Sequence, residues 1–270
     1  MTKAVILARG LGKRMRQSDG SADLDDDQAR VADSGIKALI PVGRPFLDYS
    51  LSGLADAGYC DVCLVVGPEH SEIRQYYEEE VRPQRIQVQF AVQEHPKGTA
   101  DAVAAAADFA GADPFLVINS DNYYPVEALA ALRTIDGCGT ALFERETLIA
   151  ESNIPAERVG RFGVGVIDEE RMCLTGISEK PDEEFLKSLG DDVWVSMNCW
   201  RFGPSIFEAC DAIPESPRGE LEITDAVQYA IDMLDESFSV VKIRAGVLDM
   251  TGRRDIAAVT ERLAHVEVRL

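Results

Sequence analysis

A glycine-rich turn that ends in two cations is the part of this sequence whose residue types point most directly to chemistry. Residues 4–15 read AVILARGLGKRM, in which an apolar stretch leads to Gly10 and Gly12 and then to Lys13 and Arg14. Glycine allows positive φ angles and the close approach of a ligand to the backbone. Backbone amides exposed at such a turn, before the start of a helix, favour a polyanion. The segment therefore predicts a phosphate-binding turn after a buried strand.

Two well-known phosphate motifs do not fit this turn. A dinucleotide-binding fingerprint needs a third glycine where Met15 stands. A Walker A loop needs Ser or Thr after its Lys, and here Arg14 follows Lys13. Another cation, Lys37, lies in the segment GIKALIPVGRP of residues 35–45. If the turn binds phosphate, it therefore does so together with other segments of the chain and not as either of these motifs.

Two aspartates follow strand-like segments and suit a divalent cation. Asp121 comes just after the apolar segment PFLVIN, and Asp249 lies in AGVLDMTG of residues 245–252. Open α/β sheets bind ligands at the carboxyl ends of their strands. Magnesium takes oxygen ligands and typically uses one or two carboxylates together with substrate phosphates. We expect Asp121 and Asp249 to hold one Mg²⁺ ion.

A further segment carries groups suited to a nucleobase. VQEHPKGTADAV, residues 92–103, ends a strand with Gln93 and opens a helix near Gly98 and Thr99. Glutamine offers a donor and an acceptor together, as recognition of a base edge requires, and a glycine lets a base lie against the backbone. The structural alternative is a surface glutamine and a threonine helix cap.

Taken in order, these segments resemble the signature of the nucleoside-triphosphate transferases that make nucleotide sugars. The resemblance covers essentially the whole chain and includes Ser120-Asp121-Asn122, Glu179-Lys180-Pro181 and RFGVGVID at residues 161–168. The chain departs from the family pattern in having Arg9 where glycine is usual, Ile36 before Lys37, and Val247 in place of a tryptophan. GELEITDAV at residues 219–227 also matches, but we expect its Thr224 and Asp225 to cap a helix.

The resemblance implies a role for each matching residue. Those implied in catalysis are Arg14, Lys37 and Lys180. Those implied in nucleotide binding are Leu7, Ala8, Gly10, Gly12, Lys13, Gln93, Gly98 and Thr99. Those implied in sugar-phosphate binding are Asn122, Gly163, Glu179, Lys180 and Asn198. The implied metal ligands are Asp121 and Asp249, with Mg²⁺ as cofactor.

The activity implied by the resemblance is attack of a sugar 1-phosphate on the α-phosphorus of a nucleoside triphosphate, giving a nucleotide sugar and pyrophosphate. UTP or dTTP is the favoured donor, because Gln93 suits a pyrimidine. A cytidylyltransferase acting on an alcohol phosphate such as phosphocholine is one alternative. A catalytically silent protein that binds nucleotide sugars is another, and Arg9 and the weak match around Asp249 keep it open.

The elements that must position these residues alternate along the first half of the chain. Strands are expected near 3–8, 61–67, 86–92 and 114–119, and helices near 46–57, 69–80, 98–109 and 125–134. This alternation predicts a Rossmann-like three-layer α/β/α fold with a predominantly parallel, mixed central sheet. After residue 137, strands near 139–144, 159–168, 172–178, 193–202 and 238–244 and helices near 221–234 and from 253 predict an interwoven sugar-binding subdomain. We expect one domain over 1–270, with halves 1–136 and 137–270.

The acidic segment 18–34 interrupts the signature between Arg14 and Lys37. It reads SDGSADLDDDQARVADS and holds almost no apolar side chains, so we expect a solvated loop that contributes nothing to the core. A lid that orders over bound triphosphate is the alternative. The insertion leaves open how the two cations are brought together.

Composition excludes several classes of partner. The net charge of −20, from 27 basic and 47 acidic side chains, argues against nucleic acids and anionic membranes. No apolar run approaches the ~18 residues of a membrane span, and the N-terminus lacks a secretory pattern, so a cytoplasmic protein is expected. Six cysteines include one Cys60-x-x-Cys63 pair, but zinc would need a second pair, so we expect buried, reduced thiols. A homo-oligomer is left open.

Overall fold

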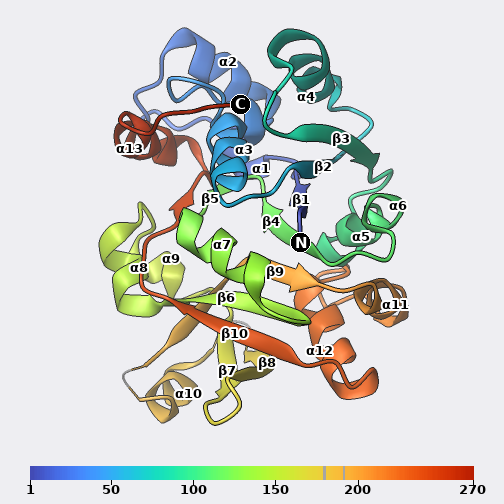
Figure 1. The fold of residues 1–270 in the computed structure, drawn as a ribbon. Helices are drawn as coiled ribbons and strands as arrows, with labels where there is room; N and C mark the ends of the chain where they lie inside the picture. Colours follow the sequence, from blue (N-terminus) through green and yellow to red (C-terminus); the bar gives the residue numbers. More distant parts are fainter. Residues whose placement is uncertain (179–180, 191) are drawn as a thin grey trace.

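A sheet of nine strands, with helices on both faces, organises the part of the chain that this computed structural model describes, residues 1–178, 181–190 and 192–270 (Figure 1). The strand order is β3-β2-β1-β4-β9-β6-β10-β8-β7, and the pairings set β9 and β8 against the direction of the others. The strands of this sheet are β1 (Lys3–Leu7), β2 (Asp61–Val66), β3 (Gln87–Val92), β4 (Phe115–Asn119), β6 (Cys138–Glu144), β7 (Val164–Asp168), β8 (Cys173–Ser178), β9 (Trp194–Phe202) and β10 (Phe238–Ile243).

The helices fill the connections between these strands. The first half contains α1 (Lys13–Arg16), α2 (Asp26–Ser34), the 3₁₀ turn η1 (Lys37–Leu39), α3 (Phe46–Asp56), α4 (Ser71–Gln75), the π-helical η2 (Tyr76–Val81), α5 (Thr99–Ala104), α6 (Ala107–Ala110) and α7 (Val126–Thr134). The second half contains α8 (Arg145–Glu151), α9 (Ala156–Val159), α10 (Glu183–Ser188), α11 (Ser205–Ala212), α12 (Ile223–Met233) and α13 (Arg253–Leu263).

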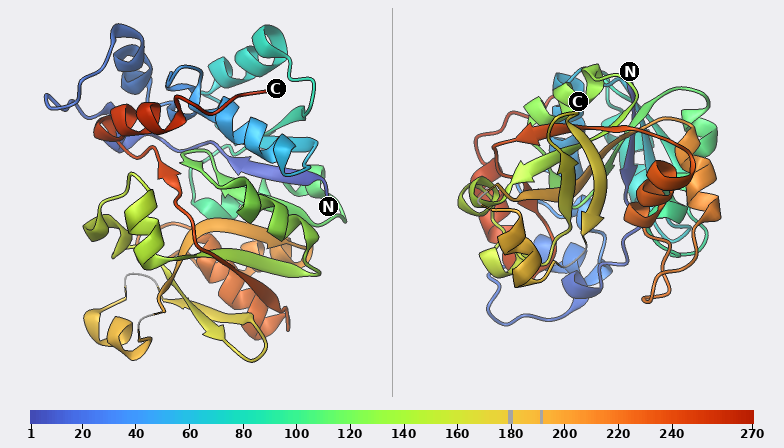
Figure 2. Two further views of the ribbon diagram at one scale, coloured as in Figure 1. Left: turned by 60° about the vertical axis from the view of Figure 1, so that its left-hand side comes forward. Right: turned by 90° about the horizontal axis from the view of Figure 1, so that it is seen from below.

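Alternation of side chains along the central strands produces the three layers. In β1, Ala4 and Ile6 point into a core with α3 and α7, whereas Val5 points into a second core with α5, α11 and α12. Successive side chains of a strand face opposite sides of the sheet, so strands buried on both faces need helices on both. The predicted three-layer α/β/α arrangement is thus confirmed, and Figure 2 shows the helices on either side of the sheet.

The two halves of the chain share the sheet. The antiparallel pairing of β4 with β9 joins the four parallel strands of the first half to the strands of the second. A second, small sheet pairs β5 (Asn122–Tyr123) with β11 (Leu248–Asp249), so a segment near the end of the chain returns to the first half. The sheet is therefore continuous across the two halves, and the division into one domain with halves 1–136 and 137–270 stays a prediction.

The acidic segment 18–34 differs from the expectation of a loop. Its second part is the helix α2, which begins with a reciprocal capping arrangement in which the Asp25 side chain accepts from the Gln28 backbone amide and Gln28 caps in return. Ala32 is fully buried in a third core with residues of α13, and Val31 packs against it. The loop prediction was wrong because a few small apolar side chains, spaced for one helix face, are enough to anchor a short helix.

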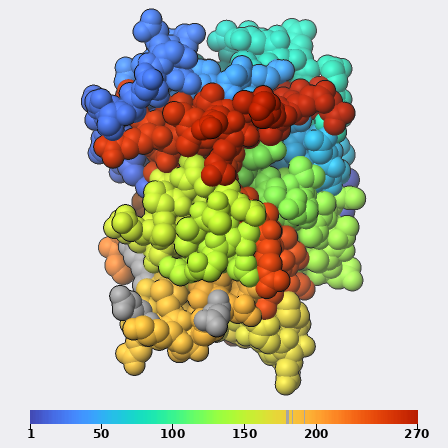
Figure 3. Space-filling view, turned by 90° about the vertical axis from the view of Figure 1, so that its left-hand side faces the viewer, coloured from blue at the N-terminus to red at the C-terminus, as the bar shows by residue number. Residues whose placement is uncertain are grey.

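Two arginines of α13 form ion pairs with aspartates of the acidic segment. Arg253 donates to the backbone oxygen of Met15 at 2.9 Å and pairs with Asp33, and Arg254 pairs with Asp19 at 2.5 Å. Figures 2 and 3 show α13 beside the segment that contains α2, and the residues after α13 running along α3. The excess acid of this segment is therefore partly neutralised by residues 220 or more positions away.

Other expected elements are shorter than the sequence pattern indicated. The helix expected over 69–80 is a short α4 that continues as the π-helical η2, and the helix expected over 98–109 is broken between α5 and α6. The strand expected from residue 159 begins at Val164, because the preceding residues form α9. In α12 the N-cap is Glu222, so Thr224 and Asp225 lie within the first turn and do not cap it.

Two expectations about composition can be compared with the described residues. Cys60 is exposed and Cys63 is buried, so the expectation of buried thiols was wrong for Cys60, which lies just before β2 and points away from the core; all six cysteines are free thiols. Among the described residues, no helix combines the length and the apolar character that a membrane crossing needs.

Candidate functional site

A cavity of about 530 Å³ opens at the carboxyl ends of β1, β3 and β4. These strands run parallel, so the segments that follow them meet at one edge of the sheet. The cavity lining contains most of the residues that the sequence singled out. They are Leu7, Ala8, Gly10, Gly12, Lys13, Arg14, Lys37, Gln93, Gly98, Thr99 and Asp121.

The glycine turn brings its two cations to the cavity. Lys13 and Arg14 are exposed, and neither side chain has a hydrogen-bond or ion-pair partner among the described residues. Cationic side chains that line a cavity without a protein partner are available to an anionic ligand. Both residues lie in α1, which is only four residues long and leaves them close to the turn.

Two glycines in contact explain how the acidic segment is accommodated. Gly12 has a φ of 58°, and a Cβ atom placed on it would lie 2.6 Å from the Cα of Gly35. Gly35 ends α2 with a φ of 78°, and its carbonyl accepts from the Lys37 backbone amide at 3.0 Å. Because the two backbones touch, the insertion leaves and returns at the same place. Lys37 is thereby brought to the cavity that Arg14 also lines.

A substitution at this contact provides a stability test. Gly12→Ala combines a strained positive φ with overlap against Gly35, and we expect it to lower the free energy of unfolding by about 2–4 kcal/mol. Gly10→Ala is the matched control, because a Cβ there meets no atom within 4 Å, and its cost should stay within about 0.5 kcal/mol. Urea unfolding of both variants measures the difference. Equal stabilities would contradict the proposed backbone contact.

Lys37 and Asp121 form the most closely paired charges of the cavity. The Lys37 Nζ lies 2.5 Å from Asp121 Oδ2, and the two side chains are 13% and 27% exposed. Their partial exposure leaves both groups within reach of a ligand in the cavity. The pair thus places a positive and a negative charge side by side at the end of β4.

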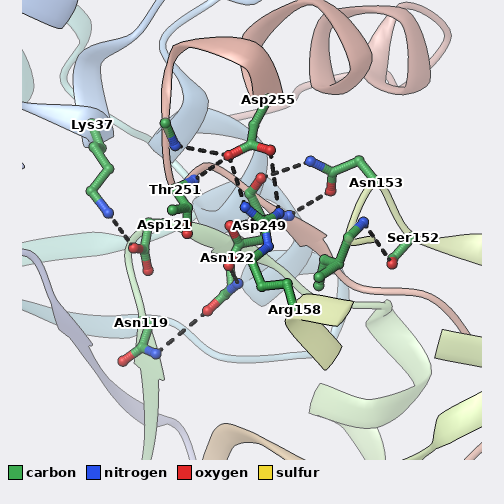
Figure 4. A network of polar contacts seen from close by, with 12 residues as sticks. Lys37, Asn119, Asp121, Asn122, Ser152, Asn153, Arg158, Asp249, Thr251 and Asp255 are labelled. Atoms are coloured by element: carbon green, nitrogen blue, oxygen red, sulfur yellow. Dashed lines mark hydrogen bonds and ion pairs between the residues drawn. The ribbon is translucent and has the colours of Figure 1, made fainter. Parts of the chain in front are cut away.

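Asp249 lies behind this pair in a buried polar network, shown in Figure 4. It is 7% exposed and does not line the cavity. Its Oδ2 accepts from Asn122 Nδ2 at 3.3 Å, and its backbone exchanges two hydrogen bonds of 2.8 Å with the Asn153 side chain. Met250 donates its backbone amide to the Asp121 carbonyl at 2.7 Å, which fixes the two aspartates relative to each other.

The charge state of Asp249 reflects its surroundings. Burial, and then the negative charge of Asp121, raise the pKa of the Asp249 carboxyl above its usual value. Arg158 Nη2 lies 3.4 Å from Asp249 Oδ1 but makes no hydrogen bond with it, and the same arginine holds Asp255 through two contacts of 3.2 Å. Asp249 Oδ1 is therefore buried without a hydrogen-bond partner in the described residues.

The donor set agrees with the expected Mg²⁺ ion. Two carboxylates that repel each other, one with an unpartnered buried oxygen, are relieved by a divalent cation that prefers oxygen. No group of three or more His, Cys, Asp or Glu side chains suited to a metal is found among the described residues. An ion here would accordingly depend on ligand oxygens for the rest of its coordination.

Gly98 and Thr99 make contacts that the sequence interpretation did not foresee. Both line the cavity, but a Cβ on Gly98 would lie 2.6 Å from the Leu221 backbone nitrogen, so packing against Leu221 already requires glycine there. The Thr99 hydroxyl accepts from the Ile223 backbone amide at 2.9 Å and so caps α12, not its own helix. These contacts fix the segment that follows β3.

The residues expected to bind the sugar phosphate are only partly gathered. Gly163 accepts from the Ser196 backbone amide at 2.8 Å, two residues before Asn198, but neither Gly163 nor Asn198 lines the cavity. Asn122 is 3% exposed, and its amide is used by Asp249, Asn119 and Tyr124. Glu179 and Lys180 lie outside the described residues. The sugar-phosphate roles of all these residues stay predictions, and the structure gives Asn122 a position that orients Asp249.

Several residues of the site were not singled out by the sequence interpretation. Arg158 and Asn153 reach Asp249 from 91 and 96 positions away, and nothing local marks them. Ser120 and Thr251 line the cavity beside the two predicted metal ligands, so their neighbours in sequence were the available signal. Glu220 also lines the cavity and lies within the GELEITDAV segment.

Comparisons with known proteins agree with this geometry. A family model described as nucleotidyl transferase matches residues 30–256. A low-salt glycan biosynthesis nucleotidyltransferase of Haloferax volcanii is 30% identical over 241 residues, which cover 85% of this chain and 59% of the relative. A glucose-1-phosphate thymidylyltransferase of Streptomyces griseus is 32% identical over 231 residues, with 85% and 57% covered. The chain thus spans less than two thirds of the length of these two relatives.

Solved structures show the same fold. A UDP-glucose pyrophosphorylase in complex with UDP-glucose superimposes with a TM-score of 0.73 at 17% identity, covering 99% of this chain and all of the other. A UDP-glucose pyrophosphorylase from Acinetobacter baumanii gives a TM-score of 0.74 at 18% identity, with 99% and 95% covered. The predicted fold class is confirmed by these matches.

Proposed function

We propose that this chain, which belongs to the nucleotidyl transferase family, transfers a nucleotidyl group from a nucleoside triphosphate to a sugar 1-phosphate. The observation that carries the proposal is one cavity that joins the cationic turn, the Lys37–Asp121 pair and a group of uncharged lining residues around Gln93. A triphosphate needs the first, a reacting phosphate the second and a base the third. The names of two relatives, a thymidylyltransferase and a uridylyltransferase acting on glucose 1-phosphate, support dTTP or UTP as the donor.

The reaction asks for alignment and charge neutralisation more than for a protein nucleophile. A phosphate monoester is anionic near neutral pH, so its oxygen can attack the α-phosphorus directly, with pyrophosphate leaving on the opposite side. Arg14, exposed on the cavity rim, would pair with the departing pyrophosphate through its planar guanidinium. Lys37 would neutralise the α-phosphate as the attacking oxygen approaches. Lys180 is proposed to hold the sugar phosphate.

The metal ligands fit the same scheme. Asp121 and Asp249 would hold Mg²⁺, which when bound supplies positive charge to the phosphate oxygens of the substrates. Asn122, Asn153 and Arg158 keep Asp249 in place beside Asp121. Charges 4 Å apart interact by about 4 kcal/mol at an effective dielectric near 20, so the cations and the ion must act together.

A donor-by-acceptor assay tests this proposal. Purified protein is incubated with Mg²⁺, one of UTP, dTTP, CTP or GTP, and one of several sugar 1-phosphates or phosphocholine, and pyrophosphate and the nucleotide product are measured. We expect turnover with UTP or dTTP and a sugar 1-phosphate. Turnover only with CTP and phosphocholine would show the cytidylyltransferase alternative. Tight binding of nucleotide sugars without any turnover would show a regulatory protein.

A further inference from the structure

Gln93 is held by contacts that fix which of its two amide groups a ligand can meet. Its Nε2 donates to the Gly98 carbonyl at 3.0 Å and to Asp101 Oδ2 at 2.7 Å. A carbonyl and an ionised carboxylate can only accept, so the amide nitrogen must face both of them. A flipped amide would set oxygen against oxygen on both sides. Among the described residues no group donates to Gln93 Oε1, so this oxygen is left for a ligand in the cavity that Gln93 lines.

The backbone of Gln93 is fixed as firmly as its side chain. Arg9, 8% exposed, donates from Nε to the Gln93 carbonyl at 2.6 Å and from Nη2 to the Glu94 carbonyl at 3.2 Å. The Gln93 backbone N–H donates to the Val66 carbonyl at 2.9 Å, which extends the pairing of β3 with β2. Because hydrogen bonds hold both the backbone and the side-chain amide of Gln93, its Oε1 presents an acceptor at one defined place.

The position of Gln93 in the cavity favours a base as its partner. The lining that comes from residues 93–102 carries no charged side chain and consists of Gln93, Pro96, Gly98, Thr99 and Ala102. Three of the cavity's cations, Lys13, Arg14 and Lys37, come from the turn after β1 and from η1. The fourth, Arg9, is buried and donates to the Gln93 and Glu94 carbonyls. A triphosphate drawn to Lys13, Arg14 and Lys37 leaves the base for the uncharged lining residues after β3.

We propose that Asp101 is a positioning residue that makes Gln93 a pure acceptor, and that this selects uracil or thymine over cytosine. The inference rests on the proposed function and adds a residue that sets donor specificity. Uracil and thymine present a ring N3–H, which Gln93 Oε1 accepts. Cytosine in the same pose turns the lone pair of its unprotonated N3 toward that oxygen, which leaves two acceptors facing each other in a buried place.

The test is Asp101→Asn, which keeps the shape of the side chain and adds a donor. The new amide can donate to Gln93 Oε1, which removes one of the two oxygen–oxygen contacts of the flipped state and leaves only the one with the Gly98 carbonyl. The flipped Gln93 amide, which can donate to cytosine, thus becomes easier to populate. We expect the ratio of kcat/KM for UTP to that for CTP to fall about 10- to 100-fold. The preference is also measured without turnover, as the ratio of the dissociation constants of CTP and UTP determined by calorimetry. Asp101→Glu, which keeps an acceptor, should stay closer to the wild-type ratio.

Matched variants separate positioning from general damage. Asp108→Asn removes an exposed carboxylate in the first turn of α6 and should leave the ratio unchanged. In a Gln93→Leu background, Asp101→Asn should no longer alter the ratio, because its effect passes through Gln93. A wild-type protein without preference for UTP over CTP, an unchanged ratio in Asp101→Asn, or an equal change in the Gln93→Leu background overturns the proposal. If no sugar 1-phosphate is turned over, the proposed function fails, whereas the binding ratio still decides the role of Asp101.

Discussion

Replacing Asp121 with asparagine should lower Mg²⁺-dependent pyrophosphate formation by about 10³-fold or more, because it removes a metal-binding charge at the reacting phosphate. The protein should remain folded. The side chain of Asp121 contacts only Lys37 through the hydrogen bonds and ion pairs of the described residues, and its carbonyl keeps the bond from Met250. The measurement is the initial rate of pyrophosphate release over a Mg²⁺ titration.

The control for this variant is Asp113→Asn, which removes an exposed carboxylate just before the other end of β4. Asp113 pairs with Lys3 and is 66% exposed, so its loss should leave the rate and the Mg²⁺ dependence unchanged. Wild-type turnover in Asp121→Asn would remove Asp121 from the metal site. A loss of turnover with an unaltered Mg²⁺ dependence would give it a role other than holding the ion.

Lys37→Ala carries the second large expectation. Removing one positive charge from the transition state should slow turnover about 10²- to 10³-fold while the melting temperature stays near that of the wild type. Because Lys37 and Asp121 are in contact, the two losses should not add, and the double variant should be less impaired than the product of the single effects. Single-turnover rates with saturating nucleotide measure both variants.

Arg30→Ala provides the comparison for Lys37→Ala. It removes a cation from the neighbouring helix α2 that is 74% exposed, so it reproduces the change in net charge without touching the cavity. Its rate should match the wild type. If Lys37→Ala turned over as fast as Arg30→Ala, Lys37 would have no part in the reaction.

The central strands could be predicted because their apolar residues leave no other interpretation. β1, β2 and β4 are short runs buried on both faces, and their ends lie within two residues of the expected positions. The extents of the helices expected over 69–80 and 98–109 were harder to predict. A hydrophobic pattern does not show where the backbone changes its hydrogen bonding, as it does at Tyr76, where the π-helical η2 begins. The loop prediction for residues 18–34 was wrong because it relied on their acidic composition, although Asp25 and Gln28 carried a local capping signal.

The motif residues of the site could be predicted because each lies just after a parallel strand. Gly10, Gln93 and Asp121 meet at one sheet edge for that reason alone. Contacts between distant segments could not be foreseen, because periodicity and turn chemistry are local. The approach of Arg158 to Asp249 and of Arg9 to Gln93 depends on packing that no short pattern encodes.

The pairing of β5 with β11 has a consequence for folding during translation. Asp249 and the arginines of α13 are translated more than 240 residues after Leu7, yet they complete a sheet edge that begins at residue 7. A nascent polypeptide released before β11 has emerged lacks one carboxylate of the pair and the clamp on the acidic helix. Catalytic competence should therefore arise only once β11 and α13 have emerged from the ribosome.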